Sequence, residues 1–254
     1  MAAEHPRILL GDDDDDLREV LGEILISEGY APVRVASAQG VLDALDRQIF
    51  RALIIDAFSS AGRKTLENVA AIVRKAGPTP VGLISGWKVT DAEIAAHGLR
   101  FAMLKPFDIP QLVVEVARML GDPLDPEKSE PARIAQRYFR ALDEKDWDAL
   151  EALCAEDVRF AGPELSRFAA VLEGRTALRR HSGETFRHFS DAKFRDLSFY
   201  ATPGGIAARY LGTWTKDGAS LGQAGTALLQ IRGGLIQRIG IEMNQALLDR
   251  LAPA

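Results

Sequence analysis

Polar side chains follow short apolar runs at four places in the first half of this chain. They are Asp12 and Asp13, Asp56, Ser85 and Lys105. The carboxyl ends of neighbouring parallel strands open onto one crevice, so we expect these side chains to meet there. Three carboxylates crowded into one crevice repel one another unless a cation lies between them. The spacing therefore predicts a cation-binding acidic pocket.

Such a pocket has the groups needed to handle a phosphoryl group. Mg²⁺ suits a site that offers a few carboxylates and a phosphate. One carboxylate can act as the nucleophile and form an aspartyl phosphate. The metal and Lys105 would neutralise charge on the transferring oxygens, and the Ser85 hydroxyl would hydrogen-bond one of them.

Alternating strand and helix patterns position these residues. The apolar runs cover residues 7–10, 32–36, 52–55, 81–84 and 101–104. Segments with helical periodicity separate them, for example Leu17, Leu21 and Leu25 on one face. This order predicts an α/β doubly wound, five-stranded parallel sheet with helices on both faces.

Residues 1–120 resemble the CheY-like receiver domain of two-component response regulators, which has a flavodoxin-like fold. The motifs that carry the resemblance are Ile8-Leu-Leu-Gly-Asp-Asp-Asp, Leu53-Ile-Ile-Asp56, Leu83-Ile-Ser85 and Met103-Leu-Lys-Pro-Phe107. The resemblance implies that Asp56 is the phosphoacceptor. It also implies that Asp12, Asp13, Asp56 and the backbone carbonyl of Phe58 bind Mg²⁺.

The same resemblance implies how the signal enters and leaves. Lys105 would bind the phosphate, and Ser85 and Phe101 would form the switch pair, with the hydroxyl moving toward phosphate and the aromatic ring turning inward. A histidine kinase or a phosphotransfer protein would supply the phosphoryl group.

This sequence departs from the receiver pattern beside the pocket. Phe58-Ser-Ser60 replaces the usual Met-Pro after the phosphoacceptor, and Gly86-Trp87 replaces a pair of small residues. We expect Trp87 near the entrance to the site and Gly11 to loosen the end of the first strand. These changes leave open an alternative in which phosphorylation is lost and the receiver serves only for dimerisation. Within the aspartate run, we expect Asp15 and Asp16 to lie near the N-terminus of the first helix, where the helix dipole stabilises their negative charge.

Composition limits the classes of protein to consider. The chain has 254 residues, of which 47% are hydrophobic and 26% charged, and its net charge is −5. That length suits two domains, and neither half has the basic surplus of a nucleic-acid binder. The single cysteine, Cys154, excludes an internal disulfide and fits the cytoplasm. We expect no signal peptide and no membrane helix.

A segment rich in proline and charge divides the chain. Residues 121–131 contain three prolines and five charges and predict a linker, so we expect domains at 1–120 and 132–254. The second shows helical patterns at 132–142, 147–154 and 245–251, and strand patterns at 194–200, 206–214, 225–232 and 235–243. Asp217-Gly218 and Gly233-Gly234 predict hairpin turns. Helices followed by a meander predict an α+β domain.

Residues 132–251 resemble the SnoaL-like and ketosteroid-isomerase-like superfamily, a curved sheet wrapped around helices to form a cone. The resemblance lies in framework motifs at residues 133–142, 146–153, 155–160, 172–178 and 231–236. Family isomerases carry a base after the first strand and often an acid near the end of the last. Gly162 and Asn244 occupy those positions here, and neither can abstract a proton.

The second half offers a possible pocket. Tyr210 and Trp214 share one strand face, and Glu242 and Asn244 share another. The alternative for the two aromatic residues is cross-strand packing or a dimer interface. On the last strand we expect Ile239, Ile241 and Met243 to face the interior and Arg238 and Glu242 to face outward. We expect His181 and His188 on a solvated helix face.

The leading hypothesis is a phosphorylation-dependent response regulator that controls a small-molecule ligand or a protein target of its second domain. The alternative is a receiver-gated small-molecule isomerase or cyclase, which needs an acid or a histidine inside the cone. We find no helix-turn-helix pattern after the linker, so we expect no direct DNA binding. We also expect a homodimer.

Overall fold

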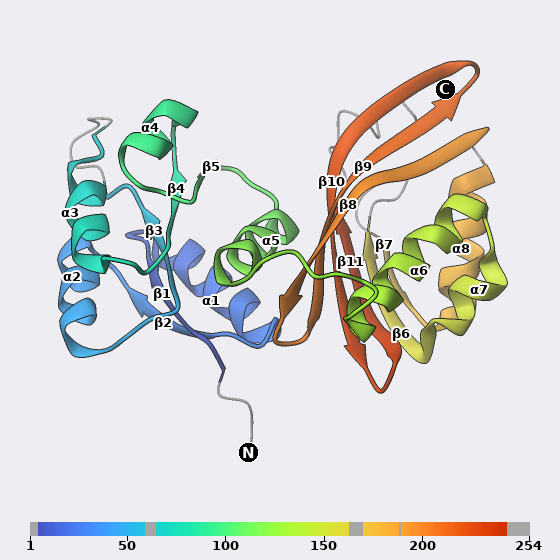
Figure 1. Cartoon of the computed structure of the whole chain (residues 1–254), viewed down its shortest axis with the longest axis horizontal. Helices are drawn as coiled ribbons and strands as arrows, with labels where there is room; N and C mark the ends of the chain where they lie inside the picture. The colour runs from blue at the N-terminus through green and yellow to red at the C-terminus, as the bar shows by residue number, and fades with distance from the viewer. Residues whose placement is uncertain (1–4, 59–64, 163–169, 188, 243–254) are drawn as a thin grey trace. The chain divides into compact units, whose positions relative to one another are not determined.

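The computed structural model describes the chain except for residues 1–4, 59–64, 163–169, 188 and 243–254. The chain forms two compact units, Met1–Leu120 and Gly121–Ala254 (Figure 1). In the described part of the chain, no helix is both long and apolar enough to cross a membrane.

The first unit is built on a five-stranded parallel sheet with the strand order β2-β1-β3-β4-β5. The strands are β1 (Arg7–Gly11), β2 (Ala31–Val35), β3 (Ala52–Asp56), β4 (Val81–Ser85) and β5 (Phe101–Leu104). Every residue of β3 and β4 is buried, because helices cover both faces of the sheet. This strand order is the flavodoxin-like arrangement, and it confirms the predicted fold class.

Five helices alternate with these strands. They are α1 (Asp15–Ser27), α2 (Ala38–Arg47), α3 (Glu67–Ala76), α4 (Asp91–Ala96) and α5 (Ile109–Leu120). Figure 1 shows α2 and α3 on one side of the sheet and α1 and α5 on the other. Leu9, Leu53 and Leu83 pack in one cluster with Val41 of α2 and Ile72 of α3.

The aspartate run divides where the first helix begins. The Asp14 side chain caps α1 by accepting a hydrogen bond from the backbone N–H of Leu17 at 3.0 Å. Asp15 and Asp16 lie in the first turn, where the helix dipole favours negative charge, as predicted. Asp12 and Asp13 are thus left at the end of β1, outside the helix.

The second unit is an α+β domain with a mixed six-stranded sheet in the order β7-β6-β11-β10-β9-β8. Its helices are α6 (Glu130–Glu144), α7 (Trp147–Ala152) and α8 (Arg175–Arg187). Its strands are β6 (Cys154–Gly162), β7 (Ala170–Glu173), β8 (Asp191–Thr202), β9 (Gly205–Lys216), β10 (Ala219–Arg232) and β11 (Leu235–Glu242). The meander from β8 to β11 is antiparallel, whereas β11 also pairs with β6 in parallel.

Two tight turns join the long strands of the meander. Asp217 and Gly218 have φ values of 51° and 79°, and Gly233 and Gly234 have φ values of 58° and 78°. Two successive residues at positive φ match the right-handed twist of the flanking strands. Both predicted hairpins are confirmed.

The segment predicted as a linker is partly structured within the second unit. Helix α6 begins at Glu130, capped by the Ser129 side chain, two residues earlier than predicted. The backbone N–H of Leu124 donates to the carbonyl of Phe199 at 2.7 Å, and the Leu124 side chain packs against the second unit's core.

Candidate functional site

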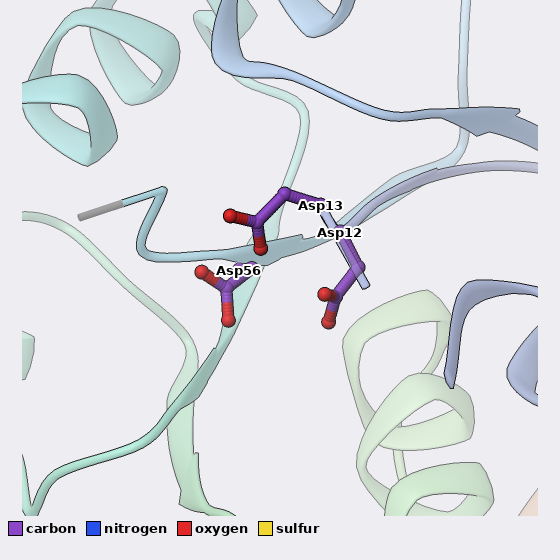
Figure 2. Close-up of side chains that lie close together, drawn as sticks. All are labelled: Asp12, Asp13 and Asp56. Atoms are coloured by element: carbon purple, nitrogen blue, oxygen red, sulfur yellow. The ribbon is translucent and has the colours of Figure 1, made fainter. Parts of the chain in front are cut away.

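The candidate site lies at the carboxyl ends of neighbouring strands in the first unit. Asp12 and Asp13 directly follow β1, Asp56 ends β3, Ser85 ends β4, and Lys105 directly follows β5. Because β1 and β3 are adjacent in the sheet, the three carboxylates gather at one place (Figure 2). One oxygen of each lies within 4.8 Å of the other two.

Lys105 bridges two of these carboxylates. Its Nζ lies 2.8 Å from Oδ2 of Asp12 and 2.7 Å from Oδ1 of Asp56. The Asp12 side chain is only 1% exposed and the Asp56 side chain 12%, so both ion pairs are largely shielded from water. The predicted acidic residues and the predicted lysine therefore do come together.

Backbone groups hold the carboxylates in place. The N–H of Phe58 donates to Oδ2 of Asp56 at 2.7 Å, and the N–H of Asp14 donates to Oδ1 of Asp12 at 3.0 Å. Arg18 donates from its guanidinium to the backbone carbonyl of Asp12 at 2.6 Å. These bonds fix the orientation of the side chains before any ligand arrives.

Burial and charge act in opposite directions on the titration of the site. Burial raises the pKa of Asp12, although bonds from Lys105 and from the Asp14 N–H oppose the increase. Burial alone would lower the pKa of Lys105, but its bonds to Asp12 and Asp56 reverse this and raise it. Two carboxylates compete for one ammonium, and a third, Asp13, lies beside them. The local charge balance is therefore negative, and a dication would correct it.

Phe58 has an unusual backbone conformation beside Asp56. Its φ is 48°, and its carbonyl accepts a hydrogen bond from Nδ2 of Asn68 on α3 at 2.9 Å. A carbonyl oxygen has two lone pairs, so this bond leaves it able to serve a second partner. Sequence reasoning missed Asn68, because a lone asparagine in a helical segment carries no signal for this contact.

Ser85 and Phe101 lie on adjacent strands. Ser85 is fully buried, and its hydroxyl accepts a hydrogen bond from the backbone N–H of Trp87 at 3.1 Å. Phe101 is 6% exposed and pairs in register with Gly82. A Cβ at Gly82 would lie 2.3 Å from Cζ of Phe101, so the aromatic ring fills the space that the glycine leaves. In this structure the ring faces inward.

Two departures from the receiver pattern have packing explanations. Gly11 continues β1 and pairs with Val35 and Ile55, and the space above it is taken by the side chains of Val41 and Phe58. The expectation that Gly11 loosens the strand end is therefore wrong. Trp87 is half-buried and packs against the cluster between the sheet and the helices α2 and α3.

In the second unit the aromatic residues predicted for a pocket pack in the core. Tyr210 and Trp214 are each 4% exposed. Their ring centroids lie 5.2 Å and 6.1 Å, respectively, from that of Phe194. Their rings also cover Gly225 and Gly212, where an added Cβ would come within 2.4 Å and 2.1 Å of them. Of the two alternatives, the structure shows packing.

The polar candidates of the second unit are only partly described. Glu242 ends β11, and its side chain lies outside the described residues, as do Met243, Asn244 and His188. Ile239 is fully buried, which confirms the predicted inward face of the strand, and Arg238 is exposed.

The position where the resemblance implies a base in the family isomerases carries no ionisable side chain here. Gly162 ends β6, where a Cβ would meet the ring of Phe160. Among the described residues of the second unit, the buried side chains that carry a hydroxyl or a thiol include Tyr138, Cys154, Ser182 and Tyr210. His181, expected on a solvated face, is half-buried, with its ring centroid 5.4 Å from that of Phe160.

Comparisons with known proteins agree with this division. Residues 135–239 match the family model of the SnoaL-like domain, so the second unit carries such a domain. The N-terminal half is homologous to response regulators. It is 30% identical over 140 residues to response regulator protein FleR of Pseudomonas aeruginosa, covering 54% of this chain and 29% of that protein.

Two further matches concern the N-terminal half. A Rickettsia bellii protein named as an NtrX-like response regulator is 27% identical over 114 residues, covering 44% of this chain and 24% of that protein. The solved structure of chemotaxis protein CheY4 of Vibrio cholerae is 22% identical, with a TM-score of 0.41, and covers 46% of this chain and 100% of that one. The chain thus spans less than a third of the length of the curated relatives named here.

Proposed function

We propose that this chain is a phosphorylation-dependent response regulator in which Asp56 accepts a phosphoryl group from a histidine kinase or a phosphotransfer protein. The observation that carries the proposal is the cluster of Asp12, Asp13 and Asp56, with Lys105 bonded to two of its carboxylates. Homology of the N-terminal half to response regulators supports the same assignment.

The donor set fits Mg²⁺. Three carboxylate oxygens lie together with one lysine, which leaves an excess of negative charge that a hard, oxygen-seeking dication would balance. Asp12, Asp13, Asp56 and the backbone carbonyl of Phe58 would hold the ion. When bound, Mg²⁺ neutralises charge on the oxygens of a phosphoryl group.

The residues of the chain perform the transfer as follows. A carboxylate oxygen of Asp56 forms a bond to phosphorus while the P–N bond of the donor phosphohistidine breaks, and the imidazole leaves with the electron pair. Lys105 stabilises the charge on the phosphoryl oxygens, which its position 2.7 Å from Asp56 supports. The Phe58 N–H holds the other oxygen of Asp56.

The output follows from the added charge. A phosphoryl group brings about −1.5 to −2 charge at neutral pH, enough to draw the Ser85 hydroxyl toward it. Ser85 and Phe101 end and begin adjacent strands, so movement of the hydroxyl would change the room available to the ring. This rearrangement would alter the exposed face of the receiver and so control the ligand, the protein target or the homodimer contacts of the SnoaL-like unit. We place this activity in the cytoplasm and without direct DNA binding.

Mass spectrometry tests the proposal. The purified chain is incubated with acetyl phosphate and Mg²⁺, beside an Asp56→Asn variant and an Asp91→Asn control that removes an exposed aspartate from α4. We expect one phosphoryl adduct in the parent and in the control, none in Asp56→Asn, and none after removal of Mg²⁺ with EDTA. Size-exclusion volume reports a change of assembly. An adduct that persists in Asp56→Asn, or no adduct in the parent, would overturn the proposal.

A further inference from the structure

The second unit has an open hollow of about 600 Å³ beside α7 and α8. Its described lining comes from the α6–α7 turn, from α7, from one face of α8 and from Phe189, and no described lining residue belongs to a strand. Phe186 and Phe189 also belong to the buried core of this unit, so the hollow borders that core. A volume of this size is in the range of pockets that hold small molecules.

One wall of the hollow is aromatic. Trp147 and Phe186 pack edge to face, with ring centroids 5.6 Å apart and planes at 67°. Trp147 is half-buried, so part of its indole ring is accessible. In the described part of the chain no acceptor contacts its indole N–H, which leaves a hydrogen-bond donor at the hollow.

Gly183 lies opposite this indole, in the middle of α8. Glycine is unfavourable in a helix interior, so its presence there calls for a packing or a functional reason. Packing does not require it, because an added Cβ would lie 3.7 Å from Nε1 of Trp147, an ordinary van der Waals distance. The absence of a side chain keeps the space in front of the indole N–H open.

The remaining wall is cationic. Arg179 is held by Asp148 and by Glu151 of α7, the latter at 2.9 Å, so it ties the two helices together. Arg180 and Arg187 line the same hollow and are exposed. Neither forms an ion pair with any carboxylate that the structure describes.

A third cation completes this wall. Lys145 lines the hollow and donates to the backbone carbonyl of Phe189 at 3.1 Å, which holds its ammonium near the aromatic wall. Within the described residues it too has no carboxylate partner. Among the described lining residues Glu184 is the one acidic side chain, against four basic ones, so their net charge is positive.

We propose that this hollow binds a small aromatic anion, that is, a flat ring that bears a carboxylate, sulfonate or phosphate group. The ring would pack against the accessible part of Trp147, which Phe186 supports from the core, and the anionic group would take charge-assisted hydrogen bonds from Arg180 and Arg187. The site goes beyond the proposed phosphoryl transfer and needs no phosphorylation of Asp56, so each can fail without the other.

The test uses the unphosphorylated full chain and two matched probes, naphthoate and the uncharged naphthalenemethanol. The chain has three tryptophans, so ¹⁵N-labelled protein gives three indole signals, and a Trp147→Phe variant assigns that of Trp147. We expect naphthoate to shift the Trp147 signal in a saturable way and naphthalenemethanol to bind about tenfold more weakly. Arg180→Gln/Arg187→Gln should weaken naphthoate binding about tenfold or more.

The control is Arg137→Gln/Arg140→Gln, which removes the same charge from the exposed face of α6. It should bind naphthoate as the parent does. Gly183→Leu keeps every charge but fills the space before the indole, and it should abolish the shift while circular dichroism shows an intact fold. Three outcomes would overturn the proposal. The two probes could bind equally well, the two double arginine variants could lose the same affinity for naphthoate, or naphthoate could shift the Trp214 signal alone. Binding of an acidic peptide without any naphthoate binding would also overturn it.

Discussion

The ring of Phe58 packs over Gly11, joining two departures from the receiver pattern that the sequence presents separately. A Cβ at residue 11 would lie 3.0 Å from Cζ of Phe58 and 2.7 Å from Cγ2 of Val41. The glycine at the end of β1 therefore makes room for a large side chain two residues after Asp56. The backbone of Phe58 also bonds to Asp56 and to Asn68, so this packing bears on the candidate site.

This relationship predicts the effect of Gly11→Ala. Overpacking a filled core costs about 1–3 kcal/mol, and we expect the free energy of unfolding in urea to fall by that amount. Displacement of Phe58 should also slow phosphorylation by acetyl phosphate. Gly86→Ala is the stability control, because a Cβ there meets nothing within 4 Å. Equal stability of the two variants would contradict the packing argument.

Removing the carboxylate of Asp13 should have two separate effects, one on the repulsion among the three carboxylates and one on the binding of Mg²⁺. Asp13 is exposed and lies within 4.8 Å of the carboxylates of Asp12 and Asp56. In Asp13→Asn without metal, we expect the free energy of unfolding to rise by up to about 1 kcal/mol, because a repulsion is relieved. The increase in Tm that Mg²⁺ gives to the parent should be largely lost. The control variant Asp91→Asn should show the same increase in Tm as the parent. If Mg²⁺ does not change the Tm of the parent, the result would argue against the metal site.

The inward position of Phe101 should depend on Gly82. An added Cβ would lie 2.3 Å from the ring, so Gly82→Ala must displace it, and we expect a loss of about 1–3 kcal/mol in the free energy of unfolding. Phe101→Leu shortens the side chain and so makes room for the added Cβ. The loss in the free energy of unfolding of Gly82→Ala/Phe101→Leu should therefore be smaller than the sum of the losses of the two single variants. A coupling energy above about 0.5 kcal/mol in this cycle supports the contact, whereas strict additivity would refute it.

The first sheet could be predicted because its central strands are buried on both faces and so appear as unbroken apolar runs. Asp12, Asp13, Asp56 and Lys105 could be predicted to cluster because they lie at strand ends. Those positions can be assigned from the sequence pattern without any knowledge of side-chain contacts. The contact of Asn68 with Phe58 could not be predicted in this way, because it depends on a loop conformation at positive φ.

The second unit was harder to predict because period-two patterns identify strands but not their partners. The parallel pairing of β6 with β11 joins segments far apart in the sequence, and local residues do not encode it. The glycines beneath Tyr210 and Trp214 illustrate the same limit. A glycine in a strand indicates a close approach, but the ring that covers it is known only from the fold.

Cys154 should be unreactive in the folded chain. It is fully buried, and burial raises the pKa of its thiol to about 12, with Arg175 lowering and Glu151 raising it less. The thiolate is the reactive form, so from pH 7 to 9 the native chain should react with a thiol reagent such as DTNB only through opening of the second unit. One thiol should react at once in denaturant. An Ala219→Cys variant, exposed on β10, is the positive control, and rapid labelling of the parent would contradict the buried position.

Two glycines in helix interiors should respond to alanine in opposite ways. A Cβ at Gly183 of α8 meets only ordinary contacts, so Gly183→Ala should raise the free energy of unfolding by about 0.5–1 kcal/mol through helix propensity. A Cβ at Gly22 of α1 would lie 1.9 Å from Nε of Arg34, whose guanidinium pairs with Glu19 and Glu23. Gly22→Ala must move that group, and we expect it to gain nothing or to lose stability. Urea unfolding of the two variants checks this order. A Gly183→Ala chain that is less stable than the parent would show that packing, rather than an open hollow, accounts for the glycine.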